Sequence, residues 1–121
     1  MTAVSGARFL SRPTNLFVYG TLMDPALVYR LTGRSLRRES AVLTGYRKVL
    51  PQGGYAYVVP DPHGRVDGFV LRDVDDATLH VFDRYEDEGH LYQRTEVLVS
   101  VAGRTEPAMT YVGLTELLIP S

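Results

Sequence analysis

One carboxylate of this sequence falls on the side of a predicted helix where apolar side chains are expected. Leu79, Phe82 and Glu86 follow one another at intervals of three and four residues, so they share one face of a helix that runs to about Glu86. A carboxylate removed from water has a raised pKa, and the C-terminal end of a helix raises it further because negative charge is disfavoured there. A pKa near neutrality suits a general acid and base. The spacing therefore predicts that Glu86 transfers protons.

A structural role for Glu86 is the alternative. Asp87 and Glu88 follow it directly, and an acidic run at a helix end is typical of a solvated surface. Arg84 and Arg94 are also close enough in the sequence to pair with the Glu86 carboxylate. The periodicity alone leaves both interpretations open.

A second candidate feature is the end of the first predicted strand. Residues 15–19 are mostly apolar, β-branched or aromatic, Gly20 ends the strand, and Asp24 with Pro25 begins a helix. A strand that ends in Gly-Thr before a helix directs two or three backbone N–H groups at one point. Such a group of donors binds an anion, a carboxylate or a developing oxyanion. An ordinary strand-to-helix turn has the same local sequence and is the alternative.

The composition limits the class of protein. The chain of 121 residues suits one domain, and we predict a flexible lead over residues 1–14 followed by a single domain over residues 15–121. The net charge of −1 suggests neither a nucleic-acid partner nor a membrane-surface partner. The lead has no apolar signal core, and no apolar run approaches the roughly 20 residues that span a bilayer. We therefore expect a cytoplasmic protein.

Other catalytic groups are missing from the sequence. The absence of cysteine excludes disulfides, thiolate metal sites and a cysteine nucleophile. His63, His80 and His90 are scattered, and no two of them have metal-ligand spacing. The sequence also has no G-x-S-x-G elbow and no phosphate-binding loop with its lysine. If the protein is an enzyme, we expect it to use no cofactor and no metal.

Several further elements are expected to position these groups. A helix of about two turns follows Asp24 and ends at Gly33, and a second helix begins at Asp73 or Asp75. The remaining segments are predicted to be strands and turns: strand pieces 41–43 and 46–50 with a bulge at Gly45, strand 55–59, a turn at 60–64, strand 66–71 as its hairpin partner, strand 92–102 and strand 107–112.

These elements predict an α+β fold. Most strands are joined by short turns and are therefore antiparallel, whereas the helix after the first strand permits a parallel or crossover pairing. Five or six strands and two helices indicate a small mixed β-barrel flanked by two short helices. Gly68, inside a strand, indicates a close backbone approach. The apolar tail at Leu117–Ile119 is predicted to pack on the barrel or on a second copy, which makes a homodimer possible.

Three segments are specific when they are taken together, because their order and spacing match one family. Residues 18–22 (V-Y-G-T-L) resemble the Y-G-[ST]-L signature of the γ-glutamylcyclotransferase-like superfamily, and residues 66–70 (V-D-G-F-V) resemble its V-x-G-x-[VL] strand. Residues 82–86 (F-D-R-Y-E), followed by Y-Q-R at 92–94, resemble its L-D-x-[FY]-E … Y-x-R segment. The resemblance covers roughly residues 15–112, and the short chain is similar to the small γ-glutamylamine cyclotransferase, or avirulence-induced, branch.

The resemblance implies a function and a set of site residues. Members of the family expel an amine from a γ-glutamyl amide and release 5-oxoproline without a cofactor, so the expected partner is a small-molecule γ-glutamyl amide. By position, Glu86 matches the catalytic glutamate. Substrate-binding positions are matched by the segment whose backbone amides hold the glutamyl group and by two tyrosines near the pocket: Tyr19, Gly20, Thr21, Leu22, Tyr92 and Tyr111.

Two departures from the family pattern leave the leaving amine open. Many members have glycine directly after the glutamate, where this chain has Asp87, and residues 55–57 (Y-A-Y) replace a Y-P segment. A binding module that holds a γ-glutamyl or amino-acid-like ligand without turnover is a second hypothesis. A structural protein that dimerises through its tail is a third.

Overall fold

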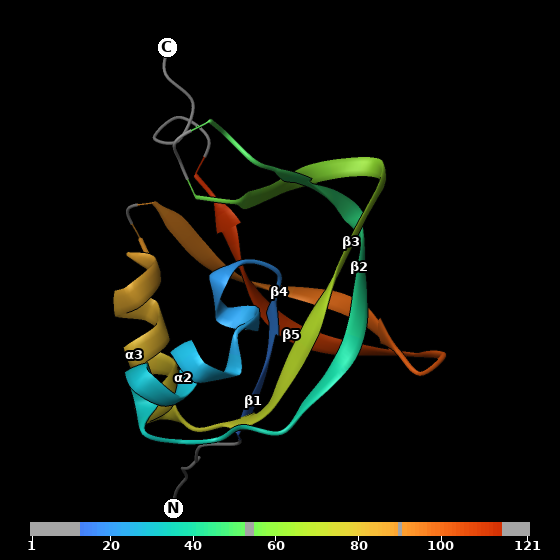
Figure 1. Ribbon diagram of the computed structural model, residues 1–121. Helices are drawn as coiled ribbons and strands as arrows, with labels where there is room; N and C mark the ends of the chain where they lie inside the picture. The colour runs from blue at the N-terminus through green and yellow to red at the C-terminus, as the bar shows by residue number, and fades with distance from the viewer. Residues whose placement is uncertain (1–12, 53–54, 90, 115–121) are drawn as a thin grey trace, which may run out of the picture.

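A closed barrel of five strands forms the body of the protein. The computed structural model describes residues 13–52, 55–89 and 91–114. Its strands are hydrogen-bonded in the order β1-β3-β2-β4-β5, and β5 returns to β1 as its parallel neighbour, whereas the other neighbours are antiparallel (Figure 1). The elements in chain order are β1 (Thr14–Val18), the 3₁₀ turn η1 (Thr21–Met23), α2 (Pro25–Thr32), β2 (Arg38–Val49), β3 (Tyr57–Val74), α3 (Asp76–Glu86), β4 (Tyr92–Val101) and β5 (Arg104–Gly113). The predicted mixed barrel with two short helices is confirmed.

Both helices begin where a side chain can accept a hydrogen bond from the first turn. The Asp24 carboxylate accepts from the Ala26 N–H at 2.9 Å, and α2 ends at Gly33, which adopts the left-handed conformation with φ 71°. For α3 the later of the two predicted aspartates is the cap, because Asp75 accepts from the Thr78 N–H at 2.8 Å. The two helices lie side by side against one flank of the barrel (Figure 1).

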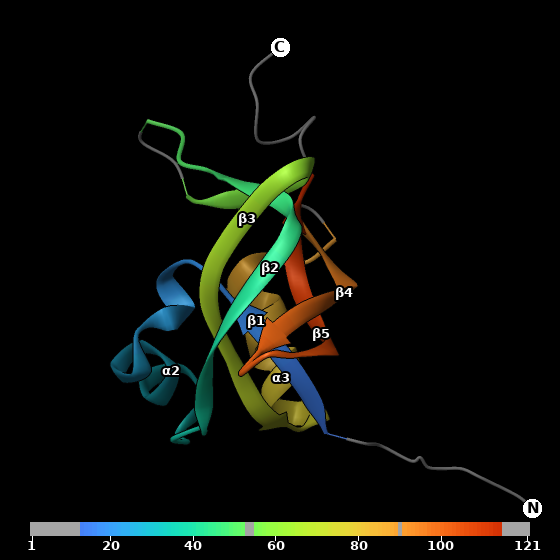
Figure 2. The same ribbon diagram turned by 90° about the vertical axis from the view of Figure 1, so that its right-hand side faces the viewer.

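The predicted hairpin within residues 55–71 is wrong. Tyr57–Val74 is a single strand, and it pairs with β2 from Val49↔Tyr57 to Arg38↔Leu71. The chain reversal therefore lies between β2 and β3, whose paired ribbon is the longest of the barrel in Figure 2. Residues 60–64 have the composition of a turn, but they do not reverse the chain.

An irregularity in the β2–β3 ladder accommodates these residues. Between two successive pairs, β2 advances by two residues from Thr44 to Tyr46, while β3 advances by five from Pro60 to Arg65. The predicted bulge at Gly45 is confirmed, and its φ of 86° is a conformation that glycine adopts without strain. The long strand thus continues past this point and pairs with β2 on both sides of the irregularity.

Close packing across β1 and β3 depends on a glycine. A Cβ on Gly68 would lie 2.2 Å from the Val18 carbonyl oxygen and 2.8 Å from the Phe17 ring, so the predicted close approach is confirmed. Val97, Val99 and Val101 are buried on one face of β4, as their alternation predicts. This packing fixes the end of β1, from which the chain turns into η1.

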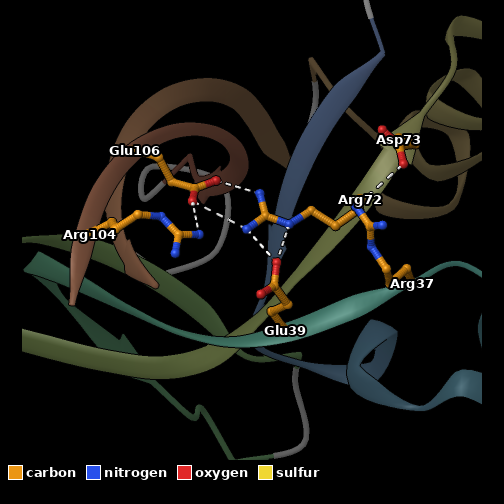
Figure 3. A network of polar contacts seen from close by, with 6 residues as sticks. All are labelled: Arg37, Glu39, Arg72, Asp73, Arg104 and Glu106. Atoms are coloured by element: carbon orange, nitrogen blue, oxygen red, sulfur yellow. Dashed lines mark hydrogen bonds and ion pairs between the residues drawn. The ribbon is translucent and has the colours of Figure 1, made fainter. Parts of the chain in front are cut away.

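An ionic cluster ties three strands together at one end of the barrel. Arg72 of β3 is almost fully buried, and its Nε donates to Glu39 of β2 at 2.7 Å (Figure 3). Its two Nη groups donate to the carboxylate of Glu106 on β5, which also pairs with Arg104 at 3.5 Å. These carboxylates hold the pKa of Arg72 above its ordinary value. The cluster lies at the end of the barrel where β2 and β5 begin and β3 ends. The cavity described below lies at the other end of the barrel.

Two predicted segments fall mostly beyond the described residues. The tail at Leu117–Ile119 lies outside them, as do residues 1–12 of the predicted lead, whereas Thr14 starts β1. In the part of the chain that the structure describes, no helix is long and apolar enough to cross a membrane.

Candidate active site

A cavity of about 510 Å³ opens at the end of the barrel where β1, β2 and β5 finish and where β3 and β4 begin. Its walls come from β1 and η1, the end of α3, and the facing strands. All the site residues predicted from the sequence line this one cavity: Tyr19, Gly20, Thr21, Leu22, Glu86, Tyr92 and Tyr111. The structure therefore brings together residues that are up to 92 positions apart in the chain.

Glu86 is the last residue of α3 and lines the cavity with a partly buried side chain. Burial raises the pKa of its carboxyl group from 4.5 to about 7, and the C-terminal end of a helix acts in the same direction. Among the described residues, no side chain or backbone group pairs with this carboxyl. The ion pair with Arg84 or Arg94 is therefore not formed, and Arg94 instead lies 3.1 Å from Asp83.

The turn after β1 faces the same cavity. η1 begins at Thr21, and the first N–H groups of a helical turn have no acceptor within that turn. Gly20 has no side chain that could cap them, and its carbonyl oxygen accepts from the Met23 N–H at 3.0 Å. These main-chain donors can interact with a negatively charged group of a ligand.

The three predicted tyrosines line the cavity, and each of their hydroxyl groups already donates a hydrogen bond within the protein. They therefore offer a ligand their rings. The Tyr19 hydroxyl donates to the Tyr111 carbonyl oxygen, and the Tyr92 hydroxyl donates to the Ala56 carbonyl oxygen at 2.7 Å. Burial raises the pKa of each phenol above its ordinary value, that of Tyr92 to about 12. They therefore stay protonated at neutral pH, and Glu86 is the group in this wall that titrates there.

Asp83 is a positioning residue that the sequence interpretation missed. It accepts a hydrogen bond from the Tyr111 hydroxyl at 2.7 Å and lies 3.1 Å from the Arg94 Nε. The signal was present, because Asp83 precedes Glu86 by three residues and so shares its face of α3. Through Tyr111 it fixes the ring that lies beside the catalytic candidate.

Lys48 and Tyr85 also line the cavity and were not predicted. The Lys48 Nζ donates to the Tyr19 carbonyl oxygen at 2.6 Å, and the hydroxyl groups of Tyr85 and Thr21 share a hydrogen bond of 2.8 Å. Lys48 is the only lysine among the 121 residues, and this rarity could have drawn attention to it. Nothing in the helical periodicity distinguished Tyr85 from an exposed aromatic residue.

The fold and the cavity together define a class of protein. The sheet closes into a small barrel, and the cavity at one end of this barrel is lined by one carboxyl group with a pKa near 7 and by a turn with main-chain N–H donors. No cluster of three or more metal-ligating side chains occurs within the described ranges. Such a site suits proton transfer on a small molecule with a negatively charged group.

Comparison with known proteins gives the family. The family described as "Gamma-glutamyl cyclotransferase, AIG2-like" matches residues 16–118, and the chain belongs to it. Two Arabidopsis thaliana relatives are AIG2-like protein C, 35% identical over 99 residues, and Protein AIG2 C, 37% identical over 86 residues. The matches cover 81% and 70% of this chain but 58% and 51% of those proteins, so the chain spans little more than half their length.

Solved structures show the same fold. A solution structure of an Arabidopsis thaliana protein superposes with a TM-score of 0.78 at 29% identity, over 87% of this chain and 71% of that one. A structure named gamma-glutamyl cyclotransferase superposes with a TM-score of 0.72 at 19% identity, over 83% and 66% of the two chains. At that identity the second likeness concerns the fold alone.

Proposed function

We propose that this protein is a cyclotransferase that cleaves a γ-glutamyl amide into 5-oxoproline and a free amine, with Glu86 as general acid and base. The observation that carries the proposal is the position of Glu86, whose carboxyl group has a pKa of about 7 and lines the same cavity as the Gly20–Leu22 turn. Membership of the family supports the reaction class. The description of that family names the same activity.

The substrate would bind with its glutamyl group against the turn. The N–H groups at the start of η1 would donate to the α-carboxylate or to the oxyanion that forms at the γ-carbon. The rings of Tyr19, Tyr92 and Tyr111 would enclose the chain in a folded conformation. This folding brings the α-amine towards its own γ-carbonyl group.

One carboxyl group is sufficient for both proton transfers. Glu86 in its ionised form takes a proton from the α-ammonium group, and the free amine attacks the γ-carbon to form a tetrahedral oxyanion. The C–N bond to the leaving amine then breaks as the protonated Glu86 gives that proton to the leaving nitrogen. The attack has left the ring nitrogen positively charged, so the ionised Glu86 takes its second proton and passes it to the released amine, which leaves as an ammonium ion. The ring closes to 5-oxoproline, one amine leaves, and no water is consumed. A pKa near 7 allows both directions of transfer at neutral pH.

The reaction needs little more than positioning. Its nucleophile and electrophile belong to the same molecule, so a site that holds the folded conformer avoids most of the entropic cost of a bimolecular step. This property suits a cavity with one titrating carboxyl group, a main-chain anion site and aromatic walls.

The test is release of 5-oxoproline from a panel of γ-glutamyl amides. The panel contains γ-glutamyl amino acids, γ-glutamyl polyamines and γ-glutamyl-ε-lysine, and the product is measured together with the released amine. We expect at least one amide of the panel to yield 5-oxoproline and its amine in equal amounts. If the protein binds a member but releases no product from any, it is a binding module and the catalytic proposal is wrong.

A further inference from the structure

The only lysine of the chain lies at the cavity. Lys48 is near the end of β2, its side chain is partly buried, and its Nζ donates to the Tyr19 carbonyl oxygen at 2.6 Å. An ammonium group has three N–H donors, so two remain after this bond. Because Tyr19 directly precedes the Gly20–Leu22 turn, the ammonium group lies beside the main-chain donors of that turn.

Lys48 has a positive charge and no negative partner within the described ranges, where no carboxylate lies within 4.0 Å of its Nζ. Its neighbour Arg47, on the opposite face of the strand, pairs with Asp61 at 3.7 Å. A partly buried charge without a counter-ion is unfavourable, and a ligand that brings the opposite charge removes this cost. The position therefore points to an anionic group of the ligand.

The charges of the cavity match those of one end of the proposed substrate. Among the described lining residues, Lys48 and Glu86 are the only charged ones. The α-carbon of a γ-glutamyl group bears an ammonium and a carboxylate, so a positive and a negative side chain in one cavity can pair with both. A leaving polyamine has no carboxylate for the ammonium of Lys48.

We infer that Lys48 forms a carboxylate subsite that binds the α-carboxylate of the γ-glutamyl group, an inference that rests on the proposed function. The pairing turns the α-ammonium group towards Glu86 and leaves the N–H groups of the Gly20–Leu22 turn for the oxyanion. Lys48 thus determines specificity for amides with a free α-carboxylate, whereas Glu86 performs the proton transfers.

The kinetic test compares two substrates that differ only in the α-carboxylate. γ-Glutamyl ethylamide has it, and 4-aminobutanoyl ethylamide lacks it and closes to 2-pyrrolidinone and ethylamine by the same steps. We expect K48M to lower kcat/KM for the first on the order of 10- to 100-fold, the size of a hydrogen bond to a charged group, and to have little effect on the second. K48R should recover part of the loss. The matched control R47M removes the adjacent exposed charge and should stay within about twofold of the wild type on both substrates.

A chemical test does not depend on activity or on a folded variant. Lys48 is the only lysine, so mass spectrometry can follow the acetylation of one side-chain amine in the wild-type protein. We expect 5-oxoproline to slow this acetylation and 2-pyrrolidinone, which lacks the carboxylate, to leave its rate unchanged.

The outcomes separate this inference from the proposed function. If K48M loses equal activity on both substrates and 5-oxoproline does not protect Lys48, the residue only holds the Tyr19 carbonyl and the inference is wrong. A loss confined to substrates with a carboxylate on the leaving amine also overturns it. If no γ-glutamyl amide is turned over, the proposed function fails, while protection by 5-oxoproline still supports the carboxylate subsite and its absence overturns that as well.

Discussion

Replacing Glu86 by glutamine should stabilise the protein near neutral pH and much less in acid. Burial raises the pKa of this carboxyl group from 4.5 to about 7 in the folded state. The folded state therefore holds the proton more tightly than the unfolded chain does. This contribution to stability is complete below pH 4.5 and is lost as the pH rises through about 7. Glutamine has nearly the same shape and does not titrate, so E86Q does not lose it.

The size of the effect follows from the two pKa values. The difference between 4.5 and about 7 corresponds to about 3 kcal/mol at 1.36 kcal/mol per pKa unit. The Glu86 side chain is only partly buried, which reduces the expected value, because solvent screens the ionised form. We therefore expect the difference in free energy of unfolding between E86Q and the wild type to increase by about 2 kcal/mol, in favour of E86Q, as the pH rises from about 5 to about 8.

The assay is urea denaturation of both proteins at a series of pH values. All other carboxylates are shared, so their titration cancels in the difference between the two curves. E96Q is the matched control, because Glu96 is exposed on β4 and does not line the cavity, so its replacement should change the free energy of unfolding little. A constant difference for E86Q, or a difference that shrinks as the pH rises, would refute the argument that Glu86 is buried without a partner.

Three further outcomes follow from the site and the core. When the release of 5-oxoproline is assayed across a pH series, kcat/KM should rise with pH to a plateau with a midpoint near 7, because Glu86 must be ionised to take the first proton. Y111F should lower the free energy of unfolding in urea by about 1–2 kcal/mol, because Asp83 loses the hydroxyl that donates to it at 2.7 Å. G68A should cost more than about 2 kcal/mol by thermal or urea denaturation, because a Cβ there would lie 2.2 Å from the Val18 carbonyl oxygen.

Each of these outcomes has a result that contradicts it. If kcat/KM did not change between about pH 5 and pH 8, the ionisation of Glu86 would not control the rate. Y29F is the control for Y111F, since Tyr29 is 57% exposed. Equal effects of the two variants would show that the hydrogen bond between Tyr111 and Asp83 does not stabilise the folded protein. An unchanged denaturation midpoint for G68A would mean that β1 and β3 can shift to accommodate the added Cβ without loss of stability.

Local chemistry made much of the fold predictable. Asp24 before a proline and Gly33 after an apolar stripe fix the ends of α2 by hydrogen bonding and backbone freedom, which depend on neighbouring residues alone. The alternation of Val97 and Val99 likewise reports which face of β4 is buried. In contrast, Pro60 and Gly64 have turn propensity, but the register with β2 keeps them within one strand. That register is a long-range property, and local propensity does not contain it.

The residues of the candidate site could be predicted where a helix places them on one face or where a family pattern marks them. Glu86 was found through its spacing from Phe82, and both the burial of Phe82 and the cavity position of Glu86 agree with that spacing. Lys48 was missed because strand alternation gives its face but not the closure of the barrel that brings it to Tyr19, 29 residues away. Contacts of this kind arise from topology, which sequence patterns leave open.

Turnover and ligand binding measured side by side in E86Q give the most direct test of the central claim. We expect release of 5-oxoproline by E86Q to fall by at least about 100-fold, the usual contribution of a general acid–base group, while the variant binds 5-oxoproline within a few-fold of the wild type. Release at the wild-type rate by a folded E86Q protein would contradict the assignment of Glu86 as the residue that moves the proton.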